Sequence, residues 1–138
     1  MKVTDEELYE GFSREQIERY EREVLEQYDP ELVRESNRRV RNMSKSEWQT
    51  LKQEGDEVTR ALAEMMDKPP EDAQVQALIA RHYATIEHFY PVSAERYRGL
   101  GQLYVENREF TTFYDRYRPG LATFMQAAMT YYADHKLA

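Results

Sequence analysis

The chemistry open to this chain is limited to histidine, carboxylate and hydroxyl groups, because its 138 residues include no cysteine. The histidines are His82, His88 and His135, and none belongs to an H-E-x-x-H motif or to the paired Glu-x-x-His motifs of di-iron bundles. Glu87 and His88 are neighbours, but successive residues of a helix point about 100° apart and do not form an acid–base pair. No Gly-x-Ser-x-Gly motif or glycine-rich phosphate loop occurs. The sequence therefore predicts no enzyme, no metal site and no cofactor.

Aromatic side chains are the unusual feature, with 11 tyrosines, 5 phenylalanines and 1 tryptophan. A buried tyrosine needs a hydrogen-bond partner for its hydroxyl, so many of them are hard to satisfy in a small dry core. Flat rings with polar tips are also the lining expected of a pocket for an amphipathic ligand. Each aromatic taken singly is more simply explained as part of a packing face. Taken together, one set favours a cavity: Tyr83, Tyr90, Tyr97, Tyr104, Tyr114 and Tyr117.

Helices must position these side chains, because apolar residues recur at three- and four-residue spacing and no window alternates with the period of a strand. Capping boxes, which mark helix starts, begin at Thr4, Ser13 and Ser44. An Asp-Pro pair at Asp29 and a single capping serine at Ser93 mark two further helix starts. Proline breaks stand at Pro69-Pro70, Pro91 and Pro119, and we expect the helix between the first two breaks to carry its apolar face from Val75 to Tyr90. The sequence predicts an all-α fold.

The N-terminal third differs from the rest, since residues 1–41 hold 20 of the 45 charged residues. Pairs such as Glu35–Arg39 support its helices only weakly, by about 0.2–0.5 kcal/mol each. Helices of this length need tertiary packing to persist. We expect a single domain over 1–138, with a helical core at 44–138. Residues 1–41 are either its least stable part, ordered when something packs beneath them, or an ordinary solvated helical segment.

The charge balance and hydropathy exclude several classes of partner. The net charge of −7 and the lack of a long basic run argue against direct binding to a phosphate backbone. No stretch approaches the roughly 20 apolar residues of a membrane span, and the polar N-terminus does not resemble a signal peptide. We expect a cytoplasmic protein with no membrane partner.

The blocks Arg98-Gly99-Leu100 with Tyr104-Val105, and Pro119-Gly120-Leu121-Ala122, stand at a specific mutual spacing. The stretches from Phe89 to Val92 and from Arg108 to Thr111 extend this pattern, as does Ser44-Lys45-Ser46-Glu47-Trp48. Together they resemble the TipAS domain, an antibiotic-recognition module at the C-terminus of a subgroup of MerR-type transcriptional activators. The resemblance covers about residues 12–128.

The resemblance implies a globin-like helical fold with a deep ligand cleft and a mobile N-terminal helical lid that folds over the ligand. The implied ligands are bulky amphipathic antibiotics, thiopeptides in the founding members. DNA would be reached only through a MerR-type winged-helix domain that this chain does not contain, and the full-length parent would be a homodimer. Members that attach thiopeptides covalently carry a cysteine where this chain has Val92, so binding here should be non-covalent.

Motif position and residue type then predict the ligand-binding residues. The lid would contribute Phe12, Tyr20 and Tyr28. The walls and floor would be formed by Trp48, His82, Tyr83, Phe89, Tyr90, Tyr97, Tyr104, Phe110 and Tyr114. Arg98 would bind a ligand carbonyl or carboxylate, or equally a carboxylate of the fold, while Gly99 and Gly101 would allow close helix approach. Two other functions stay open: a stand-alone antibiotic-sequestering protein, and a helical protein-interaction module with an open apolar groove.

Overall fold

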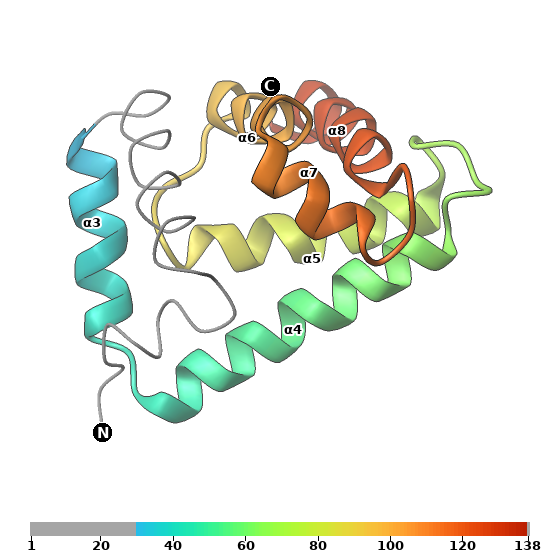
Figure 1. Ribbon diagram of the computed structural model, residues 1–138. Coiled ribbons are helices and arrows are strands. Elements are labelled where there is room, and N and C mark those ends of the chain that lie inside the picture. The colour runs from blue at the N-terminus through green and yellow to red at the C-terminus, as the bar shows by residue number, and fades with distance from the viewer. Residues whose placement is uncertain (1–29, 138) are drawn as a thin grey trace.

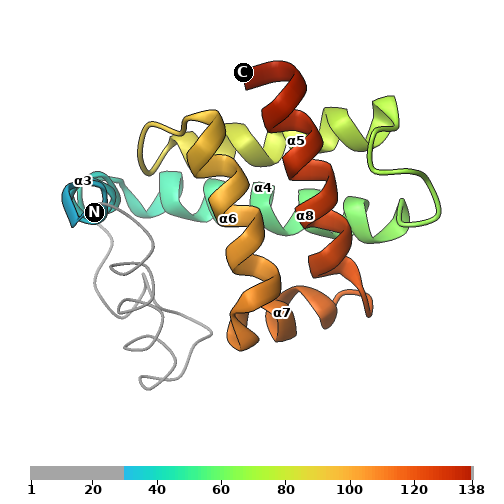
Figure 2. The ribbon, with the colours of Figure 1, turned by 90° about the horizontal axis from the view of Figure 1, so that it is seen from above.

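The computed structural model describes residues 30–137, and within that range it contains helices and no strand (Figure 1). Helix α4 (Lys45–Glu64) and helix α5 (Ala73–Glu87) form an antiparallel pair. Helices α6 (Ala94–Glu106) and α8 (Leu121–Tyr132) lie side by side and run across that pair (Figure 2). The short α7 (Arg108–Asp115) joins them, and η1 (Ala133–Leu137), one π-helical turn, extends α8. The all-α prediction is confirmed.

Side-chain caps explain where the helices begin. The hydroxyls of Ser44 and Ser93 accept from the backbone N–H groups of Glu47 and Arg96, at 3.1 Å in both cases. These caps confirm the predicted starts of α4 and α6, because each satisfies an N–H that has no partner within its helix. The carboxylate of Asp72 caps α5 in the same way, accepting from Gln74 N at 2.8 Å.

The observed α5 is shorter at its C-terminus than its apolar periodicity indicates. It ends at Glu87, although the apolar face was expected to continue to Tyr90. Pro91 accounts for the difference, because proline disfavours helical backbone in the residue before it. The non-helical residues 88–93 then turn the chain from α5 into α6.

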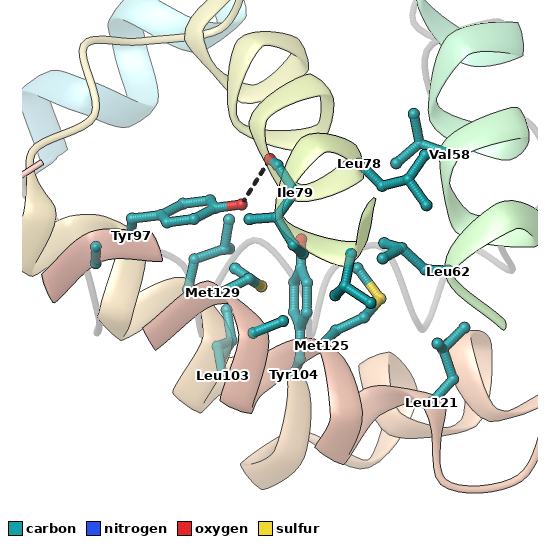
Figure 3. Packing of buried hydrophobic residues seen from close by; sticks show 14 of the residues in the cluster. Val58, Leu62, Leu78, Ile79, Tyr97, Leu103, Tyr104, Leu121, Met125 and Met129 are labelled. Carbon is teal, nitrogen blue, oxygen red and sulfur yellow. Dashed lines mark hydrogen bonds between the residues drawn. The ribbon is translucent and has the colours of Figure 1, made fainter. Parts of the chain in front are cut away.

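The core lies where α6 and α8 cross α4 and α5 (Figure 3). Its largest fully buried side chains are Tyr97, Leu62, Ile79, Leu121, Met125, Met129, Val58 and Val75. Unbranched methionines fill irregular gaps in a core, and two of them lie on the buried face of α8. Tyr97 and Tyr104 of α6 contribute rings to the same core.

The two glycines of α6 have different roles. A Cβ on Gly101 would lie 3.4 Å from the Cα of Gln126, so its missing side chain lets α6 approach α8 closely, as predicted. A Cβ on Gly99 would meet nothing within 4 Å. No described helix approaches Gly99 as closely, so the same prediction is not supported at this position.

Helix α3 (Pro30–Arg41) is the part of the charge-rich N-terminal third that can be placed. Arg39 Nη1 donates to the carbonyl of Glu87 at 3.1 Å, which ties α3 to the end of α5. The predicted Glu35–Arg39 pair is also present, at 2.8 Å. Phe12, Tyr20, Tyr28 and the capping boxes at Thr4 and Ser13 lie outside the described residues. Among the described helices, none combines the length and apolar character needed to cross a membrane.

Candidate functional site

The candidate site is built around the side chains of Tyr97 and Tyr104, which lie seven residues apart on α6. Seven residues make about two helical turns, so both side chains point from the same face of the helix. That face packs toward α5, and both rings are buried, with exposed fractions of 0% and 3% (Figure 3). Each ring therefore brings a hydroxyl into the core that must find a partner there.

His82 of α5 supplies that partner for both tyrosines. Its Nδ1 lies 2.7 Å from the hydroxyl of Tyr97, and its Nε2 lies 3.2 Å from the hydroxyl of Tyr104. Burial lowers the pKa of His82 to about 4, because a charged imidazolium would lose its hydration in the core. The imidazole is therefore neutral at pH 7 and acts there as a fixed donor and acceptor.

Ring contacts extend from this centre in two directions. Toward α7, the ring of Tyr104 lies 4.5 Å from Tyr114 and 5.5 Å from Phe110. In the other direction, the ring of Tyr97 lies 5.1 Å from Tyr83 of α5 and 5.8 Å from Tyr132 of α8. We call this set the aromatic network, and its members are Tyr83, Tyr97, Tyr104, Phe110, Phe113, Tyr114 and Tyr132, with His82 at the centre.

Trp48 and Phe89 form a second, smaller aromatic cluster. Their ring centroids are 6.3 Å apart in an edge-to-face arrangement, and they pack on the buried side chains of Met43 and Leu51. The indole Nε1 of Trp48 is inaccessible to solvent and has no acceptor among the described residues. An unsatisfied buried donor costs about 1–3 kcal/mol.

The predicted wall residues thus have different surroundings. His82, Tyr97 and Tyr104 are buried in the core and expose little surface. The other six described wall residues are half-buried: Trp48, Tyr83, Phe89, Tyr90, Phe110 and Tyr114. Tyr83 donates its hydroxyl to the carbonyl of Val92, which fixes the turn before α6. Contact of these residues with a ligand stays a prediction.

Arg98 is engaged within the fold. Its guanidinium donates to the carboxylate of Asp134 at 2.7 Å, and both side chains are partly exposed. Of the two roles predicted for Arg98, binding a ligand or binding a carboxylate of the fold, this contact matches the second. The contact joins α6 to η1 and lies apart from the ring contacts of the aromatic network.

The sequence did not assign Phe113 or Tyr132 to the site. Tyr132 lies on α8 and contacts Tyr83 and Tyr97. These contacts arise because α8 packs beside α6, which the sequence does not show. Phe113 precedes Tyr114 and contacts it edge-on at 5.1 Å. Its spacing from Phe110 on α7, and from Tyr117 just after that helix, is the sequence signal that could have identified it.

Two open hollows lie elsewhere on the described surface. One, of about 560 Å³, is lined by Arg60, Ala63, Glu64, Arg116, Tyr117 and Arg118. The other, of about 380 Å³, lies between α4 and α5, beside Leu51 and Arg81. Tyr117, one of the six tyrosines that together favour a cavity, lines the first hollow, but no residue predicted to bind the ligand lines either one. No cluster of three or more metal-ligating side chains occurs in the described part of the chain.

The family model for the TipAS antibiotic-recognition domain matches residues 20–132. The chain belongs to the TipAS family. The TipAS fold also matches in three dimensions: the structure of TipAS from Streptomyces lividans in complex with the thiopeptide nosiheptide gives a TM-score of 0.80 at 28% identity. That match covers 100% of this chain and 99% of the other.

Curated relatives of this TipAS domain are transcriptional regulators. It is 32% identical over 103 residues to the HTH-type transcriptional activator mta of Bacillus subtilis, covering 74% of this chain and 40% of mta. It is 30% identical over 99 residues to the HTH-type activator TipA of Streptomyces coelicolor, covering 70% and 39% respectively. The chain thus spans about two fifths of the length of these relatives.

Proposed function

We propose that this TipAS domain is the sensor of a MerR-type transcriptional activator and binds bulky amphipathic antibiotics without forming a covalent bond. The observation that carries the proposal is the full-length structural match to a TipAS domain that holds nosiheptide. The parent protein would be a cytoplasmic homodimer and would bind DNA through a separate winged-helix domain, as the relatives' description as HTH-type activators suggests.

The chemistry of the half-buried aromatic residues supports this function. Phe110 and Tyr114 of α7 offer flat rings, and Trp48 offers a half-buried indole ring. Such surfaces stack on heterocycles and aryl amides, while a few polar atoms orient the ligand. The carbonyl of Val92 already accepts from Tyr83, and the valine side chain has no nucleophile. Since the whole sequence lacks cysteine, thiol addition to a dehydroalanine is excluded and binding must be reversible.

A fluorescence titration tests the proposal, because Trp48 is the only tryptophan in the chain. Nosiheptide and a panel of hydrophobic antibiotics should change its emission in a saturable way. A hydrophilic antibiotic of similar mass serves as the ligand control. If residues 1–41 form a lid, their amide hydrogen exchange should slow in the same complex.

Matched variants locate the site on the protein. Phe110→Ala removes a half-buried ring of the predicted wall and should weaken binding about tenfold or more, in line with the loss of a stacking contact. Tyr131→Ala removes a half-buried ring that stacks on His135, outside the predicted wall, and should leave the affinity unchanged. Equal losses in the two variants, or emission that responds only to a protein partner, would reject the sensor function.

A further inference from the structure

The larger of the two open hollows, of about 560 Å³, is lined by three arginines: Arg60, Arg116 and Arg118. We call it the arginine hollow, and its other lining residues are Ala63, Glu64 and Tyr117. Arg60 belongs to α4, whereas Arg116 and Arg118 come from the turn between α7 and α8, which lies against the C-terminal half of α4 (Figure 1). Guanidinium groups from two distant segments therefore line one concave surface, on a chain whose net charge is −7.

Contacts within the fold hold the guanidinium groups of Arg60 and Arg116 in place. Nε of Arg60 donates to Asp56 at 2.8 Å, and the guanidinium carbon lies 5.6 Å from the centre of the Tyr117 ring. The guanidinium carbon of Arg116 lies 5.3 Å from the centre of the Phe113 ring. Side chains that are already held lose less freedom when a ligand binds, so the arginine hollow is partly preorganised.

N–H donors remain on these arginines after their contacts within the fold. A guanidinium carries five N–H donors in a fixed fork. Arg60 uses its Nε for Asp56, and 69% of its side chain is exposed. Arg118 donates from Nη1 to the carbonyl of Ala63 at 3.0 Å and from Nη2 to Asp67 at 3.3 Å. Arg116 is exposed and pairs with no carboxylate among residues 30–137.

The charges around the arginine hollow favour an anion. Three positive side chains and one negative side chain, Glu64, line it, which gives a formal balance of +2. Asp56 and Asp67 neutralise part of this charge from outside the lining. Asp67 is 87% exposed, and a surface ion pair of this kind contributes only about 0–1 kcal/mol. A ligand of higher charge can therefore replace Asp67 as the partner of Arg118 at little cost.

Shape and charge together indicate the class of anion. The volume lies within the range of small-molecule sites, roughly 300–1,000 Å³. A phosphate group carries a charge of about −1.5 to −2 at pH 7 and has three acceptor oxygens, which suits guanidinium groups from two sides. A nucleic-acid backbone needs a basic stripe that follows it, whereas these arginines are confined to one hollow of an acidic chain.

We propose that the arginine hollow binds the phosphate group of a small molecule, with Arg60 and Arg116 as the principal donors. Arg118 completes the site and also holds the turn against α4 through the carbonyl of Ala63. The site is separate from the predicted antibiotic cleft, since no residue predicted to bind the antibiotic lines it. The proposal therefore does not depend on the sensor function.

Titrations with inorganic phosphate and with adenosine monophosphate, at constant ionic strength, test the site. The arginine Nε–H signals in ¹H–¹⁵N correlation spectra report which guanidinium groups respond. We expect saturable shifts for Arg60 and Arg116 with both probes, and no shift for Arg38 of α3, which lies at the other end of α4 (Figure 1). Shifts that do not saturate, or that are equal for Arg38, would overturn the proposal.

Matched variants separate a site from the general effect of charge. Arg60→Gln and Arg116→Gln should each weaken the binding of adenosine monophosphate about fivefold, because each removes an exposed charged donor. Arg38→Gln is the control, since Arg38 is 68% exposed and paired with Glu35, much as Arg60 is paired with Asp56. It should leave the affinity unchanged, and an equal loss would overturn the proposal. Binding of a single-stranded oligonucleotide without binding of either small phosphate would also overturn it.

Discussion

Mild acid should destabilise this domain through a single buried histidine. His82 has a folded-state pKa of about 4, against 6.5 for an unperturbed histidine, and burial is the cause. The unfolded chain therefore binds a proton between these values that the folded chain does not bind. Stability contributed by such a group is present above the unfolded pKa and is lost as the pH falls toward the folded one.

The size of the effect follows from the two pKa values. At about 1.36 kcal/mol per pKa unit, the full separation corresponds to about 3 kcal/mol, and about 2 kcal/mol of it should be lost between pH 7 and pH 5. The paired carboxylates contribute little in this window. Hydrogen bonds to Arg81 and to Arg60 lower the pKa values of Glu54 and Asp56 respectively, so the stability that these carboxylates supply is lost below pH 5.

Urea unfolding of the wild-type chain at pH 7 and pH 5 measures the loss. In His82→Gln the difference between the two pH values should shrink to a few tenths of a kcal/mol, whatever the stability of the variant at pH 7. The control is His135→Gln, which changes an exposed histidine and should retain the wild-type difference. If His82→Gln also retains it, or if the wild-type stability is the same at both pH values, the reasoning is refuted.

Four substitutions test the packing that positions the site, each by thermal or urea unfolding. Gly99→Ala should stabilise the domain by about 0.5–1 kcal/mol, because alanine favours a helix and its Cβ would contact no described residue. Gly101→Val should destabilise it by about 1–3 kcal/mol, because the added side chain would lie where α6 packs on α8. Equal effects of the two substitutions would contradict this helix contact. Ser93→Ala should cost about 1 kcal/mol through loss of the α6 cap, and an unchanged stability would argue against that cap. Tyr117→Phe removes a 2.8 Å hydrogen bond to Asp56 and should lower the free energy of unfolding by about 1 kcal/mol. Burial and this hydrogen bond raise the pKa of Tyr117 to about 12, so the variant should also lose a tyrosine titration near pH 12.

Local signals in the sequence were sufficient for the helices. Ser44 and Ser93 are caps whose partners lie three residues away, so both could be read directly. Asp72 was not predicted as a cap, because Val75 stands where a Glu or Gln would complete a capping box. The end of α5 was placed too late because periodicity continues through Phe89 and Tyr90 although Pro91 limits the helix.

Contacts between distant segments decided the rest of the site. The pairing of Arg98 with Asp134 joins residues 36 positions apart, and no pattern in the sequence indicates it over a ligand contact. Tyr97, Tyr104 and His82 were grouped by residue type, but their burial follows from the packing of α6 against α8 and of α8 against α5. Tyr132 enters the network for the same reason. The lid predicted from Phe12, Tyr20 and Tyr28 remains a prediction.

Native mass spectrometry of the chain mixed with nosiheptide tests the central claim most directly. We expect a complex of one ligand per chain under native conditions and the mass of the free chain alone after denaturation, because a protein without cysteine has no thiol to retain the antibiotic. Absence of a complex would contradict the sensor function for this ligand, and an adduct that survives denaturation would contradict reversible binding.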